Sequence, residues 1–235
     1  MNSQANKKGS ANSPNLLDNT ILKSNCTGQR YEYIPVDFVK CEIVGLNIDH
    51  FKQNMYLTEY DYQRESETDY LCYKKDNIEI YCYKSGRIIL SGSLHKYINK
   101  GLHNYDTFTH QNYLNALERL KIDFAIEPDN LYIIQLEYGV NIQPPIKTKK
   151  ILDNLLTYRN KEPDQIKQGY YKNFKHDKFI IKAYDKAKQY KQKPEIFRFE
   201  IRQYWSGIRS QTGIKTLSDF NHSDKSFFVD NLISK

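Results

Sequence analysis

The sequence contains no run of about 18 apolar residues, the length that a membrane-spanning helix needs. Its N-terminus, MNSQANKKGSANSPN, has no apolar core segment, so a secretory signal peptide is not expected. Both absences exclude the membrane and secreted classes. We therefore expect a cytoplasmic protein with no membrane partner.

Cysteine is scarce, and the four cysteines form no CxxC pair. Cys26, Cys41, Cys72 and Cys82 are separated by 15, 31 and 10 residues, whereas a structural zinc site needs paired ligands in short loops. A disulfide framework is not expected in a chain of this length without a signal peptide. The spacing predicts free, partly buried thiols in a reducing compartment.

Hydrophobic residues make up only 39% of the chain, but 20 Tyr, 11 Phe and 1 Trp provide the apolar surface that a core requires. A length of 235 residues is sufficient for one large domain or two small ones. Residues 1–30 are rich in Asn, Ser and Lys and show little periodicity, so we expect a flexible tail. Residues 31–235 are expected to form a single domain.

Positive charge is concentrated in the C-terminal part of the chain. Residues 1–142 carry 15 Lys and Arg against 18 Asp and Glu, whereas residues 143–235 carry 20 against 10. Solvated surface lysines would give the same count, but the interleaved aromatic residues favour a nucleic-acid groove, in which cations follow phosphates and rings stack on bases. The candidate nucleic-acid-binding residues are Lys178, Lys182, Lys186, Lys188, Arg198, Arg202, Tyr170 and Tyr171.

Strands and helices are mixed along the chain, with hairpin-like pairing. Residue patterns predict strands at 39–48, 77–84, 87–97, 131–142, 178–190 (turning helical) and 195–205. They predict helices at 109–124, 148–158 and, for the most part, 216–233, with a loop or irregular helix at 49–70 and a basic polar loop before 178. The fold class expected is α+β, with a largely antiparallel sheet, helices on one face and an open polar face.

Four of these strands alternate apolar and polar residues, so each has one polar side. If the strands share one sheet, these sides form a single surface, which we call the polar floor. Its predicted members are Ser91, Ser93 and His95 from 87–97, Glu137 from 131–142, Lys178, Lys182, Tyr184 and Lys186 from 178–190, and Arg198, Glu200 and Arg202 from 195–205.

Two carboxylates, an imidazole and a tyrosine on a basic floor suit phosphodiester chemistry. The oxygens of Glu137 and Glu200, with His95, are of the types that hold a divalent metal. The hydroxyl of Tyr184 is a candidate nucleophile toward phosphorus, provided that nearby cations lower its pKa from about 10. The alternatives are an ion-paired sheet face around Glu200 and a structural role for His95.

Four segments carry a resemblance to a known group: RIILSGSLHKYINKGLHNYDTF, LEYGVNIQPP, FIIKAYDKAKQY and IFRFEIRQ. In this order they resemble phage and plasmid replication-initiator-like proteins, of the rolling-circle kind without a His-hydrophobe-His motif, over roughly residues 36–220. The resemblance implies DNA binding followed by nicking that depends on Mg²⁺ or Mn²⁺. It implies Glu137 and Glu200 as metal ligands and Tyr184 as the nucleophile.

The sequence departs from that group in two respects. Such initiators usually continue well beyond their last strand, whereas this chain stops about thirty residues after FRFEIRQ, and only Asp37 and Asp185 are candidates for a third acidic ligand. A second interpretation is therefore a non-catalytic protein that binds RNA or DNA. It would inhibit a nucleic-acid-guided host defence, in the manner of an anti-CRISPR protein, within a host nucleoprotein effector complex. A third is an interaction protein whose lysines only increase solubility.

Overall fold

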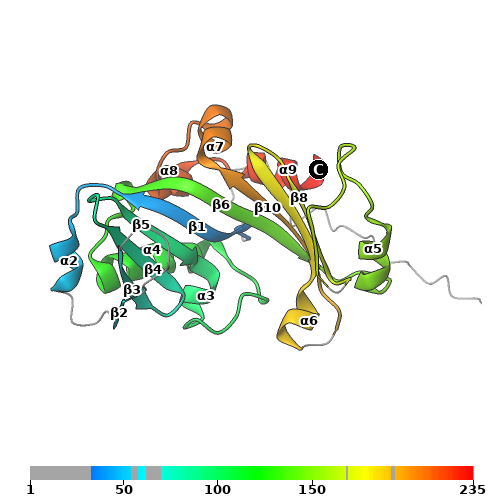
Figure 1. Ribbon diagram of the computed structural model, residues 1–235, viewed down its shortest axis with the longest axis horizontal. Helices are drawn as coiled ribbons and strands as arrows, with labels where there is room; N and C mark the ends of the chain where they lie inside the picture. The colour runs from blue at the N-terminus through cyan, green and yellow to red at the C-terminus, as the bar shows by residue number, and fades with distance from the viewer. Residues whose placement is uncertain (1–32, 54–57, 62–69, 168, 192–193, 235) are drawn as a thin grey trace, which may run out of the picture.

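The computed structural model describes residues 33–53, 58–61, 70–167, 169–191 and 194–234. The predicted tail at 1–30 lies outside these ranges. Within them, ten strands form one sheet in the order β2-β3-β4-β5-β1-β6-β10-β9-β8-β7, and every neighbouring pair is antiparallel. The predicted α+β class is confirmed, and β1, β6 and β10 form the middle of the sheet (Figure 1).

The strands are β1 (Val36–Ile43), β2 (Thr58–Asp61), β3 (Tyr70–Lys75), β4 (Ile78–Tyr83), β5 (Ile88–Ser93), β6 (Leu131–Ile142), β7 (Gln165–Lys167), β8 (Tyr171–Lys175), β9 (Phe179–Asp185) and β10 (Phe197–Tyr204). The helices are α2 (Ile48–Lys52), α3 (Leu94–Ile98), α4 (His110–Phe124), the 3₁₀ turn η1 (Pro128–Asn130), α5 (Thr148–Asn154), α6 (Lys186–Tyr190), α7 (Trp205–Thr212), α8 (Leu217–His222) and α9 (Ser226–Ser234).

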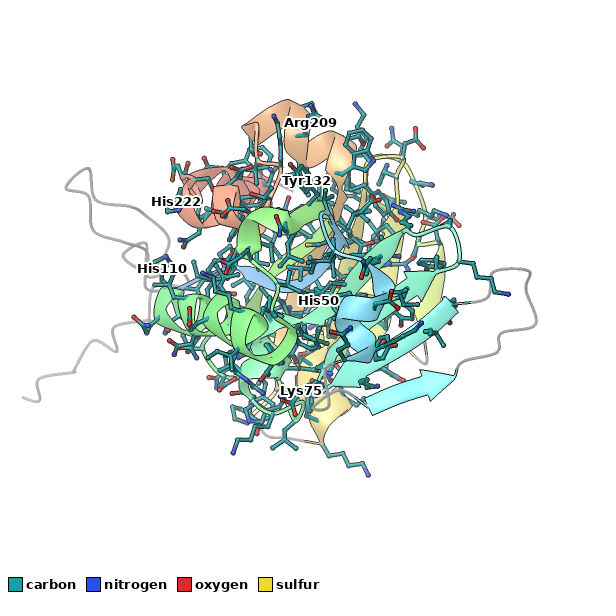
Figure 2. The ribbon with its side chains drawn as sticks, turned by 90° about the vertical axis from the view of Figure 1, so that its left-hand side faces the viewer. His50, Lys75, His110, Tyr132, Arg209 and His222 are labelled. Carbon is teal, nitrogen blue, oxygen red and sulfur yellow. The ribbon has the colours of Figure 1, made fainter. Side chains whose placement is uncertain are left out.

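The apolar side of the sheet is covered by helices, as the alternation predicts. Tyr113 of α4 donates a hydrogen bond to the carbonyl of Leu217 in α8 at 2.9 Å, and Phe228 of α9 packs edge-on against Tyr138 of β6 with ring centroids 5.0 Å apart. Figure 2 labels His110 at the start of α4 and His222 at the end of α8, and both helices lie on one side of the strands. In the part of the chain that the structure describes, no helix is both long and apolar enough to span a membrane.

The predicted strand at 87–97 is too long, and this changes the position of His95. Strand β5 ends at Ser93, whose hydroxyl accepts a hydrogen bond from the backbone N–H of Lys96 at 3.1 Å and caps α3. Serine is a preferred N-cap residue, and this capping bond competes with continued strand pairing. His95 therefore lies in a helix and not on a strand of the polar floor.

Three strands lie where loops were predicted. The region 49–70 contains α2 and β2 and leads into β3, while the basic loop before 178 contains β7 and β8, and β8 pairs with β9. In β8, Lys172 and Phe174 face the apolar side, and the ammonium group of Lys172 reaches the carbonyl of Leu155 at 2.9 Å. A lysine at an inward position hides the alternation that would identify the strand.

The thiols agree with the prediction where they are described. Cys41, Cys72 and Cys82 are free and buried, and burial raises the pKa of Cys72 and of Cys82 to about 11. Such thiols are protonated at neutral pH and serve as packing residues. Cys26 lies outside the described residues.

Candidate functional site

Strand register brings the polar sides of β6, β9 and β10 together. Glu200 of β10 lies opposite Lys182 of β9 on one side and opposite Gly139 of β6 on the other. Arg202 lies opposite Glu137, also across β6 and β10. The convergence that the polar floor requires is therefore present.

Above the polar floor the surface forms a hollow of about 870 Å³, within the range of about 300–1,000 Å³ that is usual for small-ligand sites. Its charged lining consists of four cations and four carboxylates, namely Lys96, Lys182, Lys188 and Arg202 with Asp37, Glu137, Asp185 and Glu200. The lining is balanced in charge, so any excess cationic character must come from the surrounding surface.

The charges of the polar floor are paired with one another. The ammonium group of Lys182 donates to Glu137 at 2.7 Å and to Glu200 at 2.9 Å. Arg202 Nε lies 2.5 Å from Glu137, and Arg198 Nε lies 3.3 Å from Glu200. Burial alone would raise the pKa of Glu200, but the charges of Lys182 and Arg198 hold it below its usual range.

Glu137 behaves differently from Glu200. Burial, together with the neighbouring negative charge of Glu200, raises the pKa of Glu137 to about 7. The surroundings therefore oppose ionisation of Glu137 and favour ionisation of Glu200. Burial likewise opposes the charge of Lys182, yet the two glutamates raise its pKa above the usual value.

Tyr184 lies on the polar floor, as predicted, but its neighbours do not activate it. Its hydroxyl donates to Glu200 at 3.2 Å. Burial, and then the negative charge of Glu200, raise the pKa of the Tyr184 phenol well above its usual value. Formation of a phenolate at this position is therefore unfavourable.

Several predicted members of the polar floor do not line the hollow. Lys186 is in α6 rather than on a strand, is fully buried, and donates to the carbonyl of Asn104 at 2.5 Å. His95 in α3 is hydrogen-bonded to Asp106 at 2.6 Å and stacks on Phe108 with ring centroids 4.9 Å apart. Among the described residues, neither of the two lines the hollow. Lys178 is exposed beside the start of β9 and is not part of the lining either.

The rim of the hollow combines cations with aromatic rings. The ammonium of Lys188, exposed on α6, lies 4.4 Å from the ring centroid of Tyr170. Tyr171 follows on β8, with its ring centroid 5.9 Å from that of Tyr184. Lys96 of α3 lies 5.9 Å from the ring centroid of Tyr190. The predicted nucleic-acid-binding residues Tyr170, Tyr171 and Lys188 are thus brought together at one opening.

Sequence reasoning missed Asn104 and Lys96 and left Asp37 as one of two acidic candidates. Asp37 accepts hydrogen bonds from Ser93 and Asn104 and lies 3.4 Å from Arg198 Nη2, so it joins the charged cluster from β1. Asp185, the other candidate, caps α6 by accepting from the backbone N–H of Lys188 at 2.9 Å. The loop position of Asn104 has no periodic signal; only its place in the SLHKY…GLHN segment marks it.

The carboxylates of the polar floor do not form a preformed site for a divalent metal. Within the described ranges, no group of three or more His, Cys, Asp or Glu side chains is placed to hold a metal ion. The position between Glu137 and Glu200 is taken by the ammonium of Lys182. As arranged here, these residues do not fit Mg²⁺ or Mn²⁺.

Comparison with known proteins gives a weak structural similarity. No family model matches the chain, and no curated protein matches it. A rolling-circle replication initiator protein from Geobacillus stearothermophilus is similar in structure, with a TM-score of 0.44 and 12% sequence identity. The similarity covers 83% of this chain and 78% of that protein.

Proposed function

We propose that the chain binds single-stranded nucleic acid at the hollow, with bases stacked on the rim tyrosines and phosphates contacted by the rim lysines. The observation that carries the proposal is the pair formed by Lys188 and Tyr170 at the opening, with Tyr171 beside it. Aromatic faces next to flexible cations are the usual construction of single-strand sites, where each stacked base contributes about 1–3 kcal/mol.

The distribution of charge supports the same proposal. The positive and negative charges that line the hollow are equal in number, so they do not attract a polyanion. Residues 143–235, in contrast, carry twice as many Lys and Arg as Asp and Glu. Exposed cations near β8, β9 and α6 include Lys175, Lys178, Lys188 and Lys191. Their attraction for phosphates is independent of sequence and decreases as salt increases.

The side chains of Lys182, Arg198 and Arg202 form ion pairs within the protein. We therefore do not propose them as phosphate ligands. The proposal does not use Tyr184 as a nucleophile either, because the phenol donates to a carboxylate. The proposal is therefore binding without cleavage through this tyrosine. Inhibition of a nucleic-acid-guided host defence is one use of such binding and stays a prediction.

Fluorescence anisotropy with labelled single-stranded DNA and RNA at low salt tests the proposal. Tyr170→Ala, which removes a stacking face, should weaken binding by about 5-fold to 100-fold, and Lys188→Glu should also weaken it. Arg209→Glu is the matched control, because Arg209 is an exposed cation on α7 (Figure 2) and does not line the hollow. Absence of binding by the native chain, or equal losses in all three variants, would refute the proposal.

A further inference from the structure

The carboxylate pair of the polar floor already holds a cation, the side chain of Lys182. Its Nζ atom lies 2.7 Å from Glu137 Oε2 and 2.9 Å from Glu200 Oε1. The Lys182 side chain is 11% exposed, and those of the glutamates are 9% and 4% exposed. One ammonium group thus bridges two buried carboxylates from adjacent strands.

The remaining oxygens of the two glutamates also have donors. Glu137 Oε1 accepts from Arg202 Nε at 2.5 Å. Glu200 Oε2 accepts from Arg198 Nε at 3.3 Å and from the Tyr184 hydroxyl at 3.2 Å. All four carboxylate oxygens are therefore already engaged by the protein's own hydrogen-bond donors.

The charges in this cluster oppose entry of a divalent ion. Glu137, Glu200 and Asp37 face three cations, Lys182, Arg198 and Arg202. A Mg²⁺ or Mn²⁺ ion would need carboxylate oxygens at about 2.0–2.6 Å, so it would have to displace the ammonium group. With the ammonium group in place, the three cations balance the three carboxylates, so no net negative charge remains to attract a divalent ion; without it, the cluster has a net charge of −1.

We propose that Lys182 is the resident cation of the Glu137–Glu200 pair and occupies the position that a divalent metal would need. In the native chain both carboxylates can ionise, and they keep their positions on β6 and β10 without a metal. Removing the ammonium group while leaving the glutamates opens a divalent-cation site between β6 and β10. This inference does not depend on nucleic-acid binding, because it concerns the free protein.

Isothermal titration of the full chain with MnCl₂ tests the inference. The native protein should show no saturable binding at this pair, whereas Lys182→Gln should bind Mn²⁺ at least about tenfold more tightly than the native protein. The double variant Lys182→Gln/Glu137→Gln should lose the acquired site. Lys172→Gln is the matched control: it also neutralises a buried sheet lysine, but one that donates to the backbone carbonyl of Leu155.

Thermal unfolding gives a second readout in case Lys182→Gln folds poorly. Mn²⁺ should raise the unfolding temperature of Lys182→Gln and leave those of the native chain and of Lys172→Gln unchanged, because a ligand stabilises only the state that binds it. Saturable Mn²⁺ binding by the native chain that Glu137→Gln weakens would overturn the inference. A Lys182→Gln variant that gains neither Mn²⁺ binding nor stability in Mn²⁺ would also overturn it.

Discussion

Tyr184 presents its hydroxyl to a carboxylate rather than to a cation. Its donor bond to Glu200 stabilises the neutral phenol, and ionisation would place two negative charges side by side. A tyrosine that attacks phosphorus must lose this proton. The residues that could have favoured the phenolate are engaged elsewhere, Lys182 by the two glutamates and Lys186 by Asn104.

Circular single-stranded DNA incubated with the protein and Mg²⁺ or Mn²⁺ should therefore yield no covalent adduct through Tyr184. The native chain and Tyr184→Phe should give the same pattern on denaturing gels. A protein–DNA adduct that forms with the native chain and disappears in Tyr184→Phe would contradict this prediction and would support the initiator interpretation.

Lys186 is a buried lysine whose environment opposes its charge. Burial, followed by the positive charge of Arg198, lowers the pKa of the Lys186 ammonium to about 7. In the unfolded chain the same group titrates near its ordinary value of about 10.4. Between these two values the unfolded state binds a proton that the folded state does not bind.

The free energy of unfolding should therefore increase with pH between about 7 and 10, since stability rises wherever the unfolded state holds more protons. The stability that neutral Lys186 contributes is lost as the pH falls from about 10 to the folded-state pKa of about 7. Lys186→Met should have a smaller slope over this range, measured by urea unfolding at several pH values. Parallel pH profiles for the native chain and Lys186→Met would show that Lys186 is charged in the folded state.

At the level of elements, the contact between β6 and β10 positions Glu137 and Glu200. Gly139 of β6 lies where a Cβ atom would be 2.5 Å from the carbonyl oxygen of Phe199 and 2.9 Å from Glu200 Cα. Both atoms belong to the backbone of β10, so the strands would have to separate. A glycine is therefore required for the close approach at this point.

Gly139→Ala should destabilise the fold by about 1–3 kcal/mol, the usual cost of overpacking a well-packed interior. The measurement is urea unfolding followed by circular dichroism. Gly207→Ala in α7 is the matched control, because its Cβ would meet only the Gln203 side chain and alanine favours a helix. Equal stability of Gly139→Ala and the native chain would mean that the strands are not so closely apposed.

The strands with clear alternation were predictable from the sequence. The predicted strand at 131–142 coincides with β6, and that at 195–205 contains β10, so Glu137, Glu200, Arg198 and Arg202 were placed on one face. The turn from β9 into helix α6 was also predicted. Period-two patterns with apolar residues on one side specify both the strand and its buried face.

The other features of the candidate site depend on local interactions that the periodicity of the sequence does not encode. Ser93 caps helix α3, so His95 lies in that helix and not on the polar floor. Asp185 caps α6 in the same way, and Lys186 is buried in that helix.

The pairing of Glu200 with Arg198 and of Glu137 with a lysine was open as an alternative from the sequence. That one lysine, Lys182, bridges both glutamates was not predictable, because it depends on the register of three strands. The catalytic role predicted for His95 and the nucleic-acid-binding roles predicted for Lys182 and Lys186 stay predictions.

Over the whole molecule, one sheet separates an apolar, helix-covered side from a side with a hollow. The charges that line the hollow balance, whereas residues 143–235 carry 20 Lys and Arg against 10 Asp and Glu. A single strand would therefore be attracted to the surface around the hollow and held by ring stacking at its rim. The location of the bound strand is the central claim.

Photo-crosslinking tests that location most directly. A single-stranded oligonucleotide carrying 5-iodouracil is irradiated with the native chain, and the modified peptides are identified by mass spectrometry. The account predicts crosslinks on the segment that contains Tyr170 and Tyr171, competed by unlabelled strand. Crosslinks confined to α4, α7 or α8 on the opposite side of the sheet, or none at saturating protein, would contradict it.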